Sequence, residues 1–333
     1  MGRFGLKTMT TPLSSYRILN TEPGRLSQEA RLTLRELAAV DELEVDREYL
    51  LNHIEYYDVL FICLRNVIDF EILKRAKRLK CIVTPTTGLN HIDVFNAEKL
   101  GVKILSLRGE KEFLQTVTAT AELTWALLLS LARKISTAHQ SVMAGEWVRD
   151  NFYGKELQGM TLGIIGYGRL GKMLGRYGRV FGMHVLAYDT APSPEAEVEF
   201  TSLTELLGHS DVISVHLPLT DSTYGLLDRN LFSKVKRGAI FINTSRGEIV
   251  NEAALLDAMR DGLLSGAALD VMAGESTNNQ DWLKNSLLFA YAKNHDNLLI
   301  TPHIGGVTFQ SVEKTNRFMI DKLASYLREG SIT

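Results

Sequence analysis

Short apolar runs alternate with helical patterns along nearly the whole chain. In its first third, apolar residues gather in runs typical of buried strands, and between these runs they recur every three or four positions, as on one face of a helix. Strands are expected at Tyr16–Leu19, Glu42–Val45, Val59–Leu64, Cys81–Thr84 and Val102–Leu105, and helices at Ser27–Ala39, Tyr49–Ile54, Ile68–Arg78 and His91–Leu100. Because strands that alternate with helices form βαβ units, this part predicts a small parallel sheet.

The same alternation resumes after one long apolar stretch. Thr116–Val142 carries Leu, Trp and Ala nearly all round through Leu131, which predicts one long helix buried against other protein. Six strands are then expected, as in a dinucleotide-binding sheet: Leu162–Ile165, His184–Tyr188, Val212–His216, Ala239–Asn243, Ser265–Val271 and Leu298–Thr301. An amphipathic helix follows at Ser311–Leu327. The predicted fold class is therefore α/β, with two doubly wound parallel-sheet domains.

A glycine-rich turn follows the first of these six strands. The motif is G-x-G-x-x-G, with Gly166, Gly168 and Gly171 between a strand and a helix. The first glycine permits a tight turn, the second lets the backbone approach a pyrophosphate, and the third lets helix and strand pack closely. Asp189 ends the next strand, eighteen residues after Gly171 (189 − 171), where a carboxylate can accept hydrogen bonds from the ribose hydroxyls. This context predicts a dinucleotide site, and the acid favours NAD over NADP.

Three polar residues follow later strands of the same predicted sheet. Arg246 comes after Ala239–Asn243, Glu275 after Ser265–Val271, and His303 after Leu298–Thr301. The carboxyl ends of parallel strands form the edge at which such sheets place their ligands. We therefore expect these three side chains to lie close together.

Hydride transfer to a 2-oxo acid needs the chemistry that these three residue types offer. A histidine is the usual proton donor near neutral pH, a carboxylate stabilises its imidazolium form, and a guanidinium can hold a substrate carboxylate. Taken singly, the arginine could form a surface ion pair, the glutamate could be solvated, and the histidine could be structural. Their joint placement favours catalysis by Arg246, Glu275 and His303, and His216, at a strand end beside Pro218, is expected near the cofactor.

Composition and charge disfavour several other classes of protein. The 333 residues carry a net charge of −2, so no strong field is expected to recruit nucleic acid or an anionic membrane. No apolar run approaches the length of a transmembrane helix, and the first residues lack the apolar region of a signal peptide. The two cysteines, Cys63 and Cys81, lie in apolar runs as free thiols, and no residues show metal-ligand spacing. A cytoplasmic enzyme without a metal is the expectation.

At these motifs the chain resembles the D-isomer-specific 2-hydroxyacid dehydrogenases. The resemblance rests on GYGRLG with Asp189, and on HLPLT, NTSRGEIV, ALDVMAGE and TPHIGG. It implies a Rossmann NAD-binding domain at 116–308, inserted in a discontinuous flavodoxin-like substrate domain at 1–115 plus 309–333. It also implies a homodimer built largely through Thr116–Val142.

The resemblance also implies a role for individual residues. Arg246 would bind substrate, Glu275 would support the histidine, and His303 would donate the proton. Arg65 and Gly88 match substrate-binding positions of some members. The expected cofactor residues, taken from the motifs and the resemblance together, are Gly166, Gly168, Arg169, Leu170, Gly171, Asp189, His216, Pro218, Thr244, Ser245, Arg246, Asp270, His303, Gly305 and Gly306.

The chain departs from the family pattern near the expected glutamate. Ser276 stands where proline is usual, Met272 stands where phenylalanine is usual, and the segment 276–297 is longer than common. Formate dehydrogenases of the superfamily carry glutamine where Glu275 stands, which disfavours that activity. Hydroxypyruvate, glyoxylate, 3-phosphohydroxypyruvate and a larger sugar-derived acid stay open as substrates.

Two other functions are compatible with the same fold. Corepressors that resemble this family act as NAD(H)-sensing interaction modules, and extended tails or a partner groove would favour that interpretation. A catalytically silent structural dimer is a third, which the acid, base and guanidinium at three strand ends disfavour. The leading hypothesis is an NAD-dependent oxidoreductase that interconverts a D-2-hydroxy acid and its 2-oxo acid.

Overall fold

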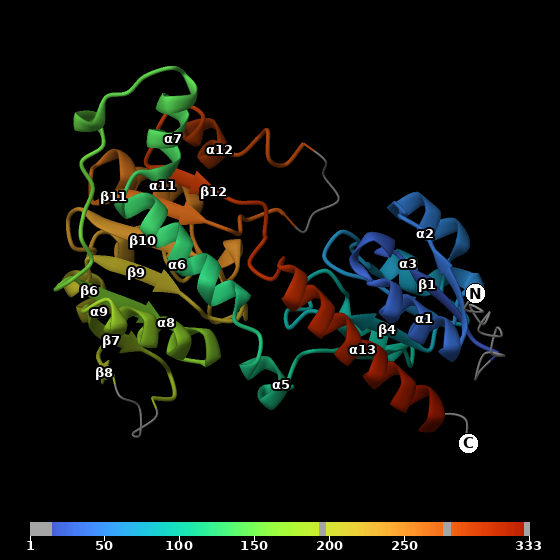
Figure 1. Ribbon diagram of the computed structural model, residues 1–333. Helices are drawn as coiled ribbons and strands as arrows, with labels where there is room; N and C mark the ends of the chain where they lie inside the picture. The colour runs from blue at the N-terminus through green and yellow to red at the C-terminus, as the bar shows by residue number, and fades with distance from the viewer. Residues whose placement is uncertain (1–14, 193–197, 276–280, 330–333) are drawn as a thin grey trace, which may run out of the picture. The chain divides into compact units, whose positions relative to one another are not determined.

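The chain folds into two compact units, each with its own parallel sheet (Figure 1). A computed structural model describes residues 15–192, 198–275 and 281–329. One unit comprises Met1–Leu114 and Thr308–Thr333, and the other comprises Gln115–Val307. Among the described residues, no helix is both long and apolar enough to cross a membrane.

In the described part of the first unit, the sheet has five strands in the order β2-β1-β3-β4-β5, all paired in parallel. This is the flavodoxin-like doubly wound order, in which the chain reverses its direction of winding between β1 and β3. The strands are β1 (Arg17–Asn20), β2 (Ala39–Glu42), β3 (Val59–Phe61), β4 (Cys81–Thr84) and β5 (Lys103–Ser106).

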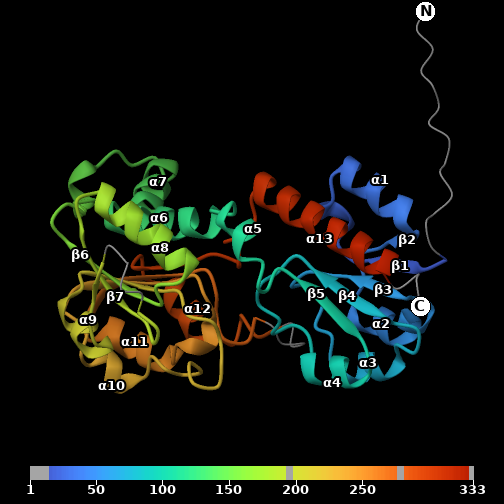
Figure 2. The ribbon, with the colours of Figure 1, turned by 90° about the horizontal axis from the view of Figure 1, so that it is seen from below.

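Helices cover both faces of this sheet (Figure 2). Because successive strand residues point to opposite faces, Ile18 packs with α1 and α13, whereas Leu19 packs under α2, α3 and α4. The helices are α1 (Gln28–Leu37), α2 (Arg47–His53), α3 (Phe70–Arg75), α4 (Val94–Lys99), α5 (Lys111–Gln115) and α13 (Phe309–Glu329). Helix α13 comes from the end of the chain and buries Met319, Ile320 and Leu323 in this unit, which makes the unit discontinuous.

Across the described residues of the second unit, seven parallel strands form one sheet in the order β12-β11-β10-β9-β6-β7-β8. Numbered from its own first strand, this is 7-6-5-4-1-2-3, the Rossmann order with one more strand at the edge. The strands are β6 (Thr161–Ile165), β7 (His184–Tyr188), β8 (Glu199–Phe200), β9 (Val212–Val215), β10 (Ala239–Asn243), β11 (Leu264–Leu269) and β12 (Leu298–Ile300). The predicted fold class, two parallel-sheet α/β domains, is confirmed.

Two layers of helices enclose this second sheet (Figure 2). Helices α6 and α8 cover one face, where Leu162 and Ile164 are buried, and α9 to α12 lie on the other face with Ile213 and Phe241. The helices are α6 (Ala119–Ala132), α7 (Ile135–Met143), α8 (Arg169–Val180), α9 (Leu203–His209), α10 (Arg229–Phe232), α11 (Glu252–Arg260) and α12 (Leu287–Ala292).

The structure corrects several predicted elements. The single helix predicted over Thr116–Val142 is wrong: α6 ends at Ala132, Lys134 adopts a left-handed backbone at φ +51°, and α7 starts anew. The spacing of apolar residues does not show where a single residue in the left-handed conformation interrupts a helix. Helix α6 is buried on the sheet of its own unit, while α7 buries no residue.

Three smaller differences concern short elements. Strand β2 begins three residues before the predicted Glu42–Val45, directly after α1, because Ala39 pairs with Arg17. The predicted six strands are seven, since the two-residue β8 is too short to show an alternating pattern. Helices α5 and α12 were also not predicted.

Candidate active site

The glycine-rich turn lies where the second sheet reverses its winding, between β6 and β9. Gly166 has φ +95°, and a Cβ there would lie 2.8 Å from the backbone of His216. A Cβ on Gly171 would lie 2.3 Å from the Gly166 carbonyl oxygen. A Cβ on Gly168, by contrast, would meet nothing within 4 Å, and this residue precedes the first residue of α8. Gly166 and Gly171 thus permit the fold, while Gly168 leaves the start of α8 open to a phosphate group.

Asp189 lies directly beside this turn. Its Oδ2 accepts the Tyr167 N–H at 2.8 Å, and its Oδ1 accepts the Ala191 N–H at 3.0 Å. The carboxylate therefore connects the end of β7 to the glycine-rich turn after β6. An acid at this place, next to an open helix start, fits the ribose and pyrophosphate of NAD.

His216 follows β9 at the same reversal point. Its backbone N–H donates to the Ile165 carbonyl at 2.7 Å, and its Nε2 lies 2.9 Å from the Ser214 hydroxyl. Its Nδ1 is buried with no hydrogen-bond partner among the described residues. Burial lowers the pKa of His216 to about 4, so the ring is neutral near pH 7. Pro218 follows in an exposed position.

The predicted histidine and glutamate are in direct contact. His303 Nδ1 lies 2.8 Å from Glu275 Oε1, and both side chains are mostly buried. A ring that donates its Nδ1 proton to a carboxylate keeps Nε2 for proton exchange with a substrate. The two residues lie 28 positions apart and follow neighbouring strands, β11 and β12.

Asp270 holds the turn that carries His303. Its carboxylate accepts the N–H groups of Ile304 at 2.8 Å and Gly305 at 2.7 Å, and the Thr301 hydroxyl at 2.6 Å. Its carbonyl accepts the His303 N–H at 2.9 Å. Burial raises the pKa of the Asp270 carboxyl even though these hydrogen bonds lower it. Asp270 therefore supports the backbone of the histidine turn, a role the sequence does not reveal.

Arg246 follows β10 at the same edge of the sheet. Burial lowers the pKa of its guanidinium, and the charges of Glu275 and Glu248 act in the opposite direction. The Asn243 side chain builds this turn: Oδ1 accepts the Ser245 N–H and hydroxyl at 3.0 and 2.8 Å, and Nδ2 donates to the Arg246 carbonyl at 2.8 Å. The predicted trio of Arg246, Glu275 and His303 thus follows the three adjacent strands β10, β11 and β12.

Two supporting residues escaped the sequence analysis. Asn243 is a strand-ending residue whose side chain turns back on its own loop, a common use of asparagine that could have indicated this turn. Thr124 in α6 places its hydroxyl 2.8 Å from that of Thr244, across 120 positions. No local pattern could have indicated that contact.

Other predicted residues have partners of their own. Arg169 Nη1 donates to the Val117 carbonyl at 2.6 Å, and burial lowers the pKa of this guanidinium. In the first unit, Arg65 forms an exposed ion pair with Glu44 at 2.8 Å, and the Gly88 carbonyl accepts the Thr86 hydroxyl at 2.8 Å. Ser276 lies outside the described residues.

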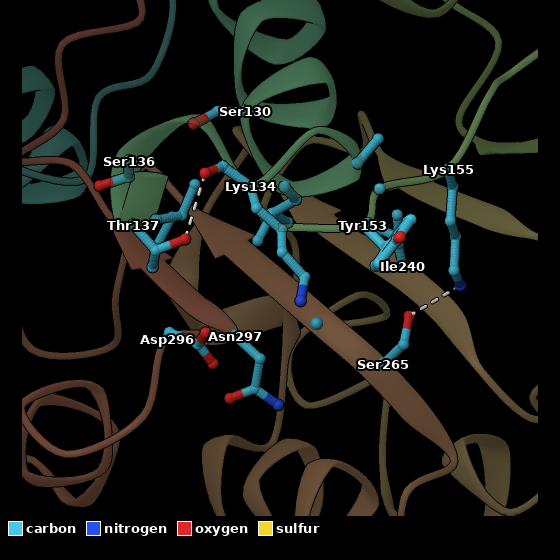
Figure 3. Close-up of a pocket in the computed structure, with 15 residues that line it drawn as sticks. Ser130, Lys134, Ser136, Thr137, Tyr153, Lys155, Ile240, Ser265, Asp296 and Asn297 are labelled. Atoms are coloured by element: carbon cyan, nitrogen blue, oxygen red, sulfur yellow. Dashed lines mark hydrogen bonds between the residues drawn. The ribbon is translucent and has the colours of Figure 1, made fainter. Parts of the chain in front are cut away.

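A cavity of about 230 Å³ lies elsewhere on the second unit (Figure 3). It is bounded by the α6–α7 junction and by residues at the amino ends of β11 and β12, opposite to the ends that carry Glu275 and His303. Figure 3 shows the Lys134 side chain pointing into it, and Lys155 donating to the Ser265 hydroxyl at 3.2 Å. None of the predicted site residues lines this cavity. Within the described ranges, no group of three or more His, Cys, Asp or Glu could hold a metal ion.

The second unit combines a Rossmann sheet and an open glycine turn with an acid at the end of the next strand. A His–Glu pair and an arginine follow three adjacent strands of the same sheet. This combination is typical of a dinucleotide-dependent dehydrogenase. Residues 125–305 match the family model of the D-isomer specific 2-hydroxyacid dehydrogenase, NAD binding domain. The chain belongs to this family, and NAD is its cofactor.

Known relatives resemble the chain over nearly its whole length. It is 33% identical to a hydroxypyruvate reductase of Thermotoga maritima over 314 residues, which are 93% of this chain and 98% of the relative. It is 34% identical to a glyoxylate reductase of Thermococcus litoralis over 293 residues, 85% of this chain and 84% of the relative. The D-lactate dehydrogenase of Aquifex aeolicus, solved with NAD and lactic acid, superposes with a TM-score of 0.81 at 28% identity, covering 94% and 96% of the two chains.

These comparisons define the class of protein. The chain is an NAD-dependent dehydrogenase of the D-2-hydroxyacid family that acts on a small hydroxy or oxo acid. The alternative of an NAD(H)-sensing corepressor-like module is not favoured, because these relatives are named as reductases and dehydrogenases.

Proposed function

We propose that the protein interconverts a D-2-hydroxy acid and its 2-oxo acid, with His303 as the proton donor and acceptor. The observation that carries the proposal is the 2.8 Å contact between His303 Nδ1 and Glu275 Oε1. In the direction of reduction, bound NADH supplies a hydride to the carbonyl carbon. His303 Nε2 then gives a proton to the carbonyl oxygen, and Glu275 stabilises the imidazolium before that transfer.

Arg246 binds the substrate carboxylate in this mechanism. Its guanidinium is largely buried, and a planar guanidinium in such a place can bind a carboxylate through two parallel hydrogen bonds. Two bonds fix the orientation of the 2-oxo group, so that the carbonyl oxygen faces His303. The negative charge of Glu275 favours the charged form of Arg246.

In this proposal, residues at the carboxyl edge of the second sheet would hold NAD. The turn from Gly166 to Gly171 at the start of α8 would hold the pyrophosphate, and Asp189 would accept hydrogen bonds from the ribose hydroxyls. The remaining contacts proposed for NAD come from Arg169, Leu170, His216, Pro218, Thr244, Ser245, Arg246, Asp270, His303, Gly305 and Gly306.

We propose glyoxylate and hydroxypyruvate as the first substrates to test. The relatives from Thermotoga maritima and Thermococcus litoralis carry these activities in their names. The first unit is the proposed substrate domain, with Arg65 and Gly88 as substrate contacts. Because Glu44 neutralises Arg65 in an exposed ion pair, a small uncharged group next to the 2-oxo acid suits this unit better than a phosphate.

We also propose a homodimer formed through α7 and the segment that follows it. Helix α7 buries no residue, and Ile135, Met143, Trp147, Val148 and Tyr153 are all exposed. Exposed apolar side chains gathered on one helix and the segment after it are typical of interaction surfaces. Light scattering should give a dimer for the wild type and a monomer for Trp147→Asp, while Phe309→Asp in the first unit stays dimeric. A monomeric wild type would contradict this.

The decisive experiment follows NADH absorbance with glyoxylate, hydroxypyruvate, 3-phosphohydroxypyruvate and larger 2-oxo acids. Oxidation with one of them, lost in a His303 variant that still binds NADH, supports the proposal. If every acid leaves NADH unchanged while NADH binds tightly, the proposed reaction is wrong.

A further inference from the structure

We propose that Glu252 is a positioning residue that holds Glu275 against His303. Glu252 is the first residue of α11, and it belongs to none of the predicted site residues. The inference rests on the proposed function, because it concerns the geometry of the His303–Glu275 pair.

The contact is a single hydrogen bond to the loop that carries Glu275. Glu252 Oε1 accepts the Ala273 N–H at 2.7 Å, across 21 positions of the chain. Ala273 lies two residues before Glu275, so this bond is made close to the point where the loop presents its carboxylate. Burial raises the pKa of Glu252, and the Ala273 N–H lowers it. The carboxyl group is thus partly withdrawn from water, and its Oε1 is bonded to this backbone group.

Gly247 packs against the same peptide group, which joins Met272 to Ala273. A Cβ on Gly247 would lie 2.0 Å from the Met272 carbonyl carbon and 2.2 Å from the Ala273 nitrogen. The Gly247 backbone therefore lies directly against the Met272–Ala273 peptide. Because Gly247 follows Arg246 in the chain, this contact also sets the spacing between the loops of Arg246 and Glu275.

Glu252 is itself held by a helix that is anchored in the core. Helix α11 is capped by Asn251, whose side chain accepts the Ala254 N–H at 3.0 Å, and it buries Leu255 in the core. Within the loop, the Glu275 N–H reaches the Met272 carbonyl only at 3.4 Å. The position of Glu275 is thus set by a helix anchored in the core.

A loop displaced by about 1 Å can lower turnover by up to about 100-fold, because catalysis depends on the alignment of reacting groups. In Glu252→Ala we expect kcat to fall by about 10-fold, with the KM for NADH unchanged. Glu252→Gln keeps an acceptor oxygen in place and should restore most of the activity. Glu252→Asp keeps the charge at the helix start but withdraws the oxygen by one methylene, so it should behave like Glu252→Ala.

Glu205 offers a matched control in the same unit. It lies in the first turn of α9 and accepts the Ser202 N–H at 3.2 Å, far from the histidine turn in sequence. Glu205→Ala removes a comparable backbone contact and should leave kcat unchanged. The proposal is wrong if Glu252→Ala and Glu252→Asp keep the wild-type kcat, or if Glu205→Ala lowers it equally.

A spectroscopic measurement tests the positioning without turnover. An imidazole Nδ1 proton that is hydrogen-bonded to a carboxylate gives a far-downfield ¹H resonance, and the His303 signal is identified by its loss in a His303 variant. This signal should persist in Glu252→Gln and disappear in Glu252→Asp. Its persistence in Glu252→Asp would overturn the proposal. An inactive wild type with the expected signals would instead contradict the proposed function alone.

Discussion

His303 contacts Glu275 through a backbone conformation that few side chains adopt. Its Nδ1 lies 2.8 Å from Glu275 Oε1, while its own φ is +52°, in the left-handed region. A left-handed residue other than glycine costs on the order of 1–3 kcal/mol. The hydrogen bonds from the following two N–H groups to Asp270 offset this cost. Strain of this kind is typical of residues that the surrounding structure holds for a function.

The backbone of His303 decides which substitution tests its role most cleanly. His303→Asn removes the proton donor but keeps a residue that tolerates the left-handed conformation. We expect kcat to fall by at least about 100-fold, the contribution of a general acid, with NADH binding mostly intact. Stopped-flow turnover and fluorescence titration with NADH measure the two quantities. A wild-type kcat in the His303→Asn variant would exclude the histidine as proton donor.

Gly168 and Gly171 should respond differently to the same substitution. Gly168→Ala places its Cβ in open space, so the protein should fold with unchanged stability but bind NADH at least about 10-fold more weakly, because the methyl group meets the pyrophosphate. Gly171→Ala places its Cβ 2.3 Å from the Gly166 carbonyl oxygen and should lower the melting temperature. Calorimetry with NADH titration distinguishes them. Equal effects on stability would refute this division of roles.

Asp189 combines two functions that two variants can separate. Asp189→Asn keeps an acceptor for the Tyr167 N–H but removes the charge, whereas Asp189→Ala removes both. Loss of the charge alone should raise the NADPH-to-NADH ratio of kcat/KM by about 10-fold, since repulsion of the 2′-phosphate disappears. The alanine variant should in addition bind both cofactors more weakly. If neither variant changes the ratio, the charge does not select the cofactor.

The buried ring of His216 should make the protein sensitive to acid. Its pKa is about 4 in the folded chain and 6.5 when exposed, so between these values the unfolded state binds more protons. The free energy of unfolding is therefore highest above pH 6.5 and should fall by up to about 3 kcal/mol towards pH 4.

Urea unfolding from about pH 7 to about pH 4.5 measures this effect. His216→Asn should show a shallower pH dependence than the wild type, and replacement of the exposed His139 by Asn should leave the dependence unchanged. Identical slopes for the wild type and His216→Asn would show that the ring does not titrate as proposed.

The sequence by itself determined the alternation of strands and helices, apart from the break at Lys134 and a few short elements, and the positions of the candidate residues along it. Strand and helix patterns are local, and the glycine turn with Asp189 lies within one βαβ unit, so both can be recognised without knowledge of the tertiary fold. The carboxyl ends of parallel strands lie at one edge of a sheet, and from this rule the sequence predicts that Arg246, Glu275 and His303 lie close together. In the structure, the three residues follow three adjacent strands.

Only the tertiary structure decided the contacts that give these residues their geometry. The Asp270 bond to Ile304, the Thr124–Thr244 pair and the Glu252–Ala273 bond join positions that are 34, 120 and 21 residues apart. The break at Lys134 likewise depends on a single backbone angle. Such contacts arise when loops and helices from distant parts of the chain pack together, and no periodicity along the chain reveals them.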